Sequence, residues 1–296
     1  FYLSIVVRIM IFAIAAVSLD LILGFGGMVS FGHAAFIGIG AYGVGILSAH
    51  DLGDAAFQLP ASLVAAALFA FVTGWISLRT KGVYFIMITL AFAQMALFFM
   101  TSLSGYGGDD GMTLWMRSTV AGTSLFANPT GFYYVCFGAL LVTYLLCRSI
   151  VASRFGRVLR GAKENAVRME AIGFDPFRFR LAAYVISGTL CGLSGFLLAN
   201  QTEFVSPAFM TWQRSGELLI MVILGGLGTL HGAIIGAAAF IFLEDWLAGF
   251  TDHWRILFGP MLVIVALFME RGILGLVSGT PTRSCPSSTC ARATAR

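Results

Sequence analysis

The chain has 296 residues, of which 58% are hydrophobic and only 11% are charged, and its formal net charge is +4. Its mean hydropathy is +0.90. A soluble domain carries about 25% charged residues, so this composition excludes an ordinary water-exposed globular domain. The 35 glycines point the same way, because small residues let membrane helices approach closely. We therefore expect an all-α, polytopic helical bundle embedded in a lipid bilayer.

A helix needs about 20 mostly apolar residues to cross a hydrocarbon core of about 30 Å. Apolar segments of roughly this length recur along the chain, at 3–23, 33–49, 59–78, 83–103, 132–147, 181–201 and 254–270. The stretch 217–243 is longer and is interrupted by glycines. It is either one tilted helix or two short helices joined at its Gly-Thr-Leu-His run. The sequence thus predicts about eight or nine spans, some of them broken or re-entrant.

Charge predicts the orientation of these spans. The loop 148–180 holds eight of the 18 Lys and Arg residues, and because cytoplasmic loops collect such residues, we expect it to be cytoplasmic. If 217–243 crosses once, the acidic turn with Glu244, Asp245 and Asp252 lies inside. If it is a broken hairpin, this turn lies outside and the arginine-containing tail inside. The charge rule favours the broken hairpin.

Residues 1–278 are predicted to form one transmembrane domain. Residues 279–296 are rich in Ser, Thr, Pro and Arg without an apolar period, which predicts a disordered tail. Within it, Cys285 and Cys290 lack the His or second Cys pair of a zinc site. We expect neither a metal site nor a disulfide framework.

The segment 24–42 combines helix-weakening glycines with polar side chains at membrane depth. Each glycine lowers helix stability by up to about 1 kcal/mol, so the first part of the segment is predicted to be irregular or re-entrant. Polar groups at this depth are costly and tend to face a cavity or a partner. Ser30 and His33 are therefore candidates for a substrate path, with a purely structural role of His33 as the alternative.

Three further residues complete the predicted substrate path: Gln94, Gly226 and His231. Gln94 is a polar side chain inside an apolar span, and it can alternatively hydrogen-bond to another helix. Gly226 and His231 belong to the second glycine-rich stretch, 225–232. Irregular backbone is tolerated at membrane depth only where it is buried in protein or faces a water-filled cavity.

Four ordered motifs resemble those of a known family. They lie at 26–42 (GGMVSFGHAAFIGIGAY), 81–95 (KGVYFIMITLAFAQM), 153–160 (SRFGRVLR, followed by Glu164 and Asn165) and 224–233 (LGGLGTLHGA). Together they are similar to the LivM family, the M-type permease subunits of branched-chain amino-acid ABC importers. The run 107–111 departs from the usual turn of that family, and the tail after Val277 matches none of its features.

The resemblance implies a division of labour between subunits. Such permeases act in the bacterial cytoplasmic (inner) membrane with a second permease subunit, two ATP-binding-cassette ATPases and an extracytoplasmic solute-binding protein. This sequence has no Gly-x-x-x-x-Gly-Lys-Ser/Thr phosphate loop, so we expect ATP to be used by the partner subunits. We then expect that this chain is not an enzyme, needs no cofactor and binds no nucleic acid.

The cytoplasmic loop is the expected docking place of the ATPases. Residues 161–172 are predicted to form one short exposed helix that ends at Gly173. The run Glu170-Ala-Ile-Gly173 resembles a reduced form of the loop by which importer permeases engage their ATPases. The predicted coupling residues are Arg157, Lys163, Glu164, Glu170, Ala171 and Gly173. A basic loop that only fixes the topology is the alternative.

The sequence thus predicts a permease subunit that moves branched-chain amino acids, or a related small solute, by alternating access. A urea or amide permease of the same type stays open, as does an ion-coupled secondary transporter, for which Asp20 is the available membrane acid. A membrane-embedded enzyme would have only His33 and His231 as candidate groups. Arg8, the other charged residue of the first span, can snorkel to a membrane surface.

Overall fold

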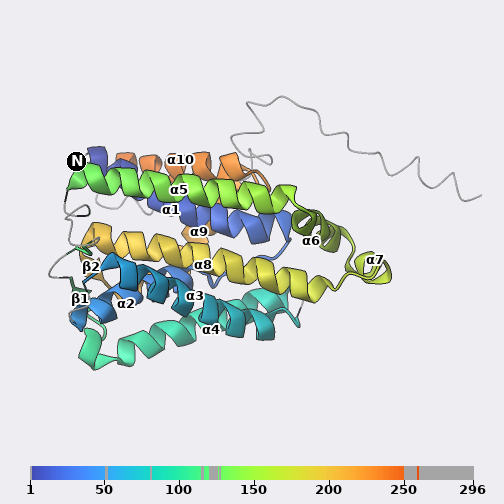
Figure 1. Ribbon diagram of the computed structural model, residues 1–296, viewed down its shortest axis with the longest axis horizontal. Coiled ribbons are helices and arrows are strands. Elements are labelled where there is room, and N and C mark those ends of the chain that lie inside the picture. Colours follow the sequence, from blue (N-terminus) through green and yellow to red (C-terminus); the bar gives the residue numbers. More distant parts are fainter. Residues whose placement is uncertain are drawn as a thin grey trace, which may run out of the picture.

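The computed structural model describes residues 2–50, 53–80, 82–114, 117–119, 126, 128–249 and 259. In chain order the elements are α1 (Tyr2–Asp20), η1 (Leu21–Phe25), α2 (His33–Ala49), α3 (Ala55–Ser77), α4 (Val83–Ser102), η2 (Ser104–Tyr106), β1 (Met112–Thr113), α5 (Pro129–Ala152), α6 (Arg154–Glu164), α7 (Ala166–Ala171), α8 (Pro176–Thr202), β2 (Phe204–Val205), η3 (Pro207–Met210), α9 (Trp212–Gly225) and α10 (Leu230–Ala248). The long helices lie side by side in one bundle. The short antiparallel β1–β2 pair lies at one end of it and α6 and α7 at the other (Figure 1).

The all-α membrane fold expected from the composition is confirmed. Among the described residues, six helices are long and apolar enough to cross a membrane: α1 continued by η1, α3, α4, α5, α8 and α10. α2, with 17 residues, and α9, with 14, are shorter. The predicted span at 254–270, except residue 259, and the predicted boundary at 278 lie outside the described residues.

The centre of the bundle is formed by α1 and α8. In their most apolar stretches, 78% of α1 and 67% of α8 is buried, against 17% of α5. Small residues make this central position possible, because a Cβ on Gly195 of α8 would collide with the Ile37 carbonyl oxygen of α2. Along the same face, a Cβ on Gly192 would meet the Ala66 side chain of α3. The outer faces of α3, α4 and α5 expose large apolar side chains, as lipid-facing helices do.

The stretch 217–243 is a broken hairpin, as the charge distribution favours. α9 ends at Gly225, and Gly226 takes a positive φ of 111°, a conformation that suits glycine. The two helices are antiparallel and almost touch, since a Cβ on Gly236 of α10 would collide with the Met221 carbonyl oxygen of α9. A helix of 14 residues is about 21 Å long, too short to cross the membrane. α10 therefore returns to the end of the bundle that holds the start of α1 (Figure 1).

The prediction of a single helix at 161–172 is wrong. Two helices, α6 and α7, meet at Asn165, whose backbone is extended (φ −153°, ψ 99°). The Asn165 side chain accepts a hydrogen bond from the Arg168 N–H at 3.0 Å and so caps α7. Asparagine is a strong N-cap residue, and this local preference breaks the helix. Gly173, with φ of 95°, follows the end of α7 as expected. We call residues 154–173 the α6–α7 arm.

Candidate functional site

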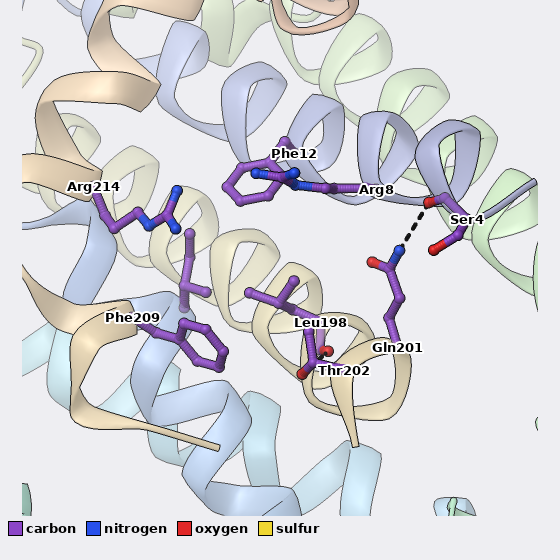
Figure 2. Close-up of a pocket in the computed structure, with 9 residues that line it drawn as sticks. Ser4, Arg8, Phe12, Leu198, Gln201, Thr202, Phe209 and Arg214 are labelled. Atoms are coloured by element: carbon purple, nitrogen blue, oxygen red, sulfur yellow. Dashed lines mark hydrogen bonds between the residues drawn. The ribbon is translucent and has the colours of Figure 1, made fainter. Parts of the chain in front are cut away.

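A cavity of about 430 Å³ opens between α1, α2, α8, η3 and α9 (Figure 2). It lies at the end of the bundle opposite the α6–α7 arm, because Ser4 is near the start of α1 and Thr202 is the last residue of α8. Its polar lining comes from Ser4, Arg8, Gln201, Thr202 and Arg214. Its apolar lining comes from Phe12, Ile37, Leu198 and Phe209. We call it the arginine cavity.

Both arginines of this cavity have acidic partners outside its lining. Arg8 donates from Nη2 to the two Glu244 carboxylate oxygens at 3.1 and 3.2 Å, and its Nη1 lies 3.5 Å from Asp245 Oδ1. Arg214 Nη1 donates to Glu217 Oε2 at 2.7 Å. About a third of each arginine side chain is exposed. In Figure 2 the two side chains extend toward the cavity from opposite sides, near the Phe12 ring.

Gln201 adds a polar group with unused bonding capacity. Its Nε2 donates to the Ser4 carbonyl oxygen at 2.9 Å. Its Oε1 is buried and has no hydrogen-bond partner in the part of the chain that the structure describes. An unpaired buried acceptor costs about 1–3 kcal/mol, so this oxygen is a ready acceptor for a ligand donor.

A second cavity, of about 350 Å³, lies toward the other end of the bundle. It is bordered by Gly26 and Gly27 after η1, by the turn between α3 and α4, and by Phe85 and Arg180. Arg180 Nη2 donates to the Ala162 carbonyl oxygen of α6 at 2.7 Å, which ties this cavity to the α6–α7 arm. We call it the glycine cavity.

A closed layer separates the two cavities along α8. Arg180 borders the glycine cavity and Leu198 the arginine cavity, a separation of about 27 Å along the helix axis. Between them, Ser187 donates its hydroxyl proton to the Ser18 carbonyl oxygen at 2.5 Å. His33 Nε2, at 2.9 Å, must then donate to Ser187 Oγ. In a neutral imidazole His33 Nδ1 is consequently an acceptor, and it has no partner among the described residues.

Aromatic and backbone contacts complete this layer. The Tyr184 ring packs edge-on against His33 and against Phe85, at centroid distances of 6.1 and 6.2 Å. Ser30 lies beside the Tyr184 hydroxyl and is fully buried. On the side of the arginine cavity, Ser215 Oγ accepts the Ala34 N–H at 3.1 Å. We call Ser30, His33, Tyr184, Ser187 and Ser215 the central layer.

The five residues predicted to form the substrate path do not meet in one place. Ser30 and His33 lie in the central layer, and Gly226 lies in the hairpin turn between α9 and α10. Gln94 is half-buried on α4. His231 is exposed at the start of α10, where it bonds to the Tyr144 hydroxyl of α5. Their roles in transport stay predictions.

The predicted coupling residues lie together on the α6–α7 arm, and all of them are exposed: Arg157, Lys163, Glu164, Glu170, Ala171 and Gly173. Lys163 also bonds within the chain, because its Nζ donates to the Gly24 carbonyl oxygen at 2.7 Å. Close by, Asp20 Oδ1 accepts the Gly228 N–H of the hairpin turn at 2.8 Å. Asp20, the acid available to an ion-coupled transporter, is thus part of a helix contact.

Sequence analysis did not assign the polar residues of the arginine cavity to the substrate path. Arg8 did carry a signal, since a charged residue inside an apolar span is costly and often functional. Arg214 and Glu217 carried another, the three-residue spacing of an ion pair on one helix face. Gln201 carried no signal, because a polar residue at the end of a span is ordinary.

A multi-pass bundle with a cavity toward each end and a closed layer between them defines a protein of the membrane-permease class. The sequence matches the family described as "Branched-chain amino acid transport system / permease component" over residues 1–266. The chain belongs to this family, which confirms the resemblance that the four motifs indicated.

Curated relatives agree with this assignment. The permease protein LivM of Escherichia coli (strain K12) is 26% identical over 90% of this chain and 68% of its own length. The permease protein LivH of the same strain is 22% identical over 89% of this chain and 91% of its own. BraD of Pseudomonas aeruginosa is 24% identical, with the same two coverages as LivH. All three are named as permease proteins of high-affinity branched-chain amino acid transport systems. No solved structure matches the chain.

Proposed function

We propose that this chain is a permease subunit of an ATP-binding-cassette importer that carries branched-chain amino acids across the bacterial cytoplasmic membrane. In this proposal it acts with a second permease subunit, two ATPases and an extracytoplasmic solute-binding protein. The substrate class follows that named for LivM, LivH and BraD. The chain itself binds no nucleotide, and the ATP is used by its partners.

The arrangement of the two cavities is the observation that carries the transport mechanism. The arginine cavity and the glycine cavity lie along the same helix, α8, and the buried side chains of the central layer lie between them. A carrier that works by alternating access needs such a barrier, which opens toward one cavity at a time. We therefore assign the arginine cavity to the outward-facing side, the glycine cavity to the cytoplasmic side, and the central layer to the closed gate.

Energy from the ATPases would reach this gate through the α6–α7 arm. α7 has no buried residue, and its Val167 is 72% exposed, so the arm offers a surface to a partner. The Lys163 bond to Gly24 connects the arm to the end of η1. The Asp20 bond to Gly228 connects the neighbouring end of α1 to the α9–α10 turn. A displacement of the arm is thereby passed to the helices that hold the central layer.

Reconstitution tests this function. The assembled importer, with its binding protein, is placed in liposomes that contain ATP, and uptake of radiolabelled L-leucine is measured. We expect uptake that requires both ATP and this chain. Uptake that persists without ATPases but follows an imposed ion gradient would instead establish the secondary transporter. Absence of leucine uptake alongside uptake of urea would establish the amide-type permease.

A further inference from the structure

We infer that the arginine cavity recognises a zwitterionic α-amino acid with an aliphatic side chain, so that this chain itself selects the solute. This inference rests on the proposed function and adds the residues that bind each part of the solute. The cavity's volume, about 430 Å³, falls in the range of small-molecule sites, roughly 300–1,000 Å³.

The carboxylate would be bound by the two arginines. Arg214 uses Nη1 on Glu217, and its Nε and Nη2 have no hydrogen bond to the described residues. A guanidinium edge of this kind binds a carboxylate through two parallel N–H donors, which gives both strength and orientation. Arg8 faces the same space from α1, and its cation adds attraction for the same carboxylate (Figure 2).

The ammonium group would be bound by Gln201. Gln201 borders the cavity. Its Oε1 is buried and has no partner in the described part of the chain, whereas its Nε2 donates to the Ser4 carbonyl oxygen. The hydrogen bond from Nε2 therefore fixes the orientation of the Gln201 amide and leaves its Oε1 acceptor unpaired. Behind the arginines lie three carboxylates, those of Glu217, Glu244 and Asp245, against two guanidinium groups. This surplus of negative charge adds attraction for the ammonium group.

The aliphatic side chain would be bound by the apolar lining of Phe12, Ile37, Leu198 and Phe209. These side chains come from α1, α2, α8 and η3, so an aliphatic group would be enclosed on several sides. Burial of apolar area is favourable and non-directional, so this part of the site fits leucine, isoleucine or valine without close selection among them. Urea or a short amide would leave both the arginines and the apolar lining unused.

Bound solute would also lie next to the gate. Ile37 is one helical turn beyond His33 on α2, and Arg214 precedes Ser215, whose hydroxyl accepts the Ala34 N–H. A solute held by Arg214 and Ile37 therefore contacts the two segments that meet in the central layer.

A thiol introduced into the cavity tests this inference in the assembled importer, because its reaction reports binding to this subunit and not to the binding protein. The three native cysteines of the described region are buried. Thr202→Cys introduces a cysteine in the lining, in a background in which Cys285 and Cys290 are replaced by serine. The rate of its reaction with a small thiol reagent is measured without binding protein, with added L-leucine, 3-methylbutylamine (which lacks the carboxylate) or 4-methylpentanoate (which lacks the ammonium group). We expect L-leucine to slow labelling and both analogues to be much weaker.

Variants in this background identify the groups involved. Arg214→Gln and Gln201→Leu should each raise the L-leucine concentration for half-protection by about tenfold. Arg117→Gln is the matched control, since this arginine pairs with Glu203 and does not border the cavity. The inference is overturned if L-leucine gives no protection, if both analogues protect equally well, or if neither cavity variant changes the protection. ATP-dependent leucine uptake by the same preparation tests the proposed function separately: uptake without protection refutes the cavity site alone, protection without uptake refutes the proposed function alone, and absence of both refutes both.

Discussion

Lys163 on α6 donates a hydrogen bond from its ammonium group to the carbonyl oxygen of Gly24, at 2.7 Å. Gly24 lies in the π-helical turn η1 (Leu21–Phe25), which continues α1. The lysine stem also covers Gly27, where a Cβ would lie 2.8 Å from Lys163 Cγ. The exposed arm and the centre of the bundle are thus joined through one side chain. This contact connects the arm to α1. Lys163 thus makes a specific tertiary contact, in addition to contributing a positive charge to the loop.

Replacing Lys163 by methionine should uncouple transport from ATP use. Methionine keeps an apolar stem against Gly27 but removes the charged donor, and a hydrogen bond from a charged group contributes about 1.5–3 kcal/mol. We expect leucine uptake per ATP hydrolysed to fall by about tenfold, measured in the reconstituted importer. Arg178→Gln is the control, because Arg178 is 85% exposed and pairs only locally with Asp175. An unchanged uptake-to-ATP ratio in the Lys163 variant would refute the connection.

Adding one methyl group at Gly24 should destabilise the permease. A Cβ there would collide with Asp20 Oδ1 and with the Gly228 backbone, whose Cα would be 2.6 Å away. Overpacking of this kind costs about 1–3 kcal/mol, so Gly24→Ala should lower the thermal transition measured by size-exclusion chromatography after heating. Gly138 of α5 has nothing within 4 Å of its Cβ position. Gly138→Ala should therefore be neutral or stabilising by up to about 1 kcal/mol, and equal shifts in the two variants would contradict the close approach.

Changes on α7 should weaken ATPase binding without unfolding the permease. Val167 is 72% exposed, and Glu170 is exposed one turn further on, so Val167→Asp with Glu170→Lys removes no buried contact. We expect a normal amount of permease in the membrane and about a tenfold loss of copurified ATPase. Gly173→Pro is a harsher change, because proline requires φ near −65° and Gly173 has φ of 95°. Normal recovery of ATPase with the double variant would show that α7 is not the docking surface.

His33→Leu should impair transport more than assembly. Leucine cannot donate to Ser187 Oγ, but Ser187 keeps its own bond to the Ser18 carbonyl oxygen, so no buried donor is left unpaired. The expected cost in stability is only about 1 kcal/mol, while the gate loses its polar connection between α2 and α8. Uptake should fall several-fold at an unchanged yield of the complex. His50→Leu, on the exposed end of the same helix, is the matched control; a parallel loss of yield and uptake would reduce His33 to a packing residue.

Cysteine labelling should establish the orientation of the bundle. The α6–α7 arm and the β1–β2 pair lie at opposite ends (Figure 1), and Asp109 lies in the turn between η2 and β1. A probe at Ser153 and one at Asp109 should therefore react from opposite sides of the membrane. In intact cells an impermeant reagent should label Asp109→Cys and spare Ser153→Cys. Native Cys285, in the tail predicted to be cytoplasmic, should also be spared. Labelling of Ser153→Cys from outside would invert the proposed orientation.

Local properties of the sequence predicted most of the helices. The span expected at 33–49 is observed as α2 with the same bounds, and that at 83–103 as α4, Val83–Ser102. The existence of the hairpin break was also accessible, because glycines weaken a helix and charge reports which side of the membrane each end occupies. Its position was only partly right, since the break lies at 226–229 and Leu230 and His231 of the predicted Gly-Thr-Leu-His join already belong to α10. Helix formation and membrane insertion depend on residues within about 20 positions of one another, so each helix can be predicted from its own segment of the sequence.

Similar local patterns did not reveal tertiary environments. His33 and His231 both follow glycine-rich runs, yet His33 is fully buried between α1, α2 and α8, and His231 is exposed beside Tyr144. The break at Asn165 has a local cause instead, because its side chain caps α7, a preference that the apolar periodicity did not reveal. In each case the outcome depended on a competing contact, which composition and periodicity do not encode.

The sequence by itself determined the class of protein, the position and order of most of its apolar helices and the family to which it belongs, since these follow from hydrophobicity, charge and short motifs. Only the tertiary structure brought Ser4, Gln201 and Arg214 to one cavity and placed His33 against Ser187. These residues are separated by 13 to 210 positions, and their contacts depend on how small residues let α1, α2 and α8 approach one another. The physical reason is that a binding site arises from packing between helices, whereas each helix forms from its own residues.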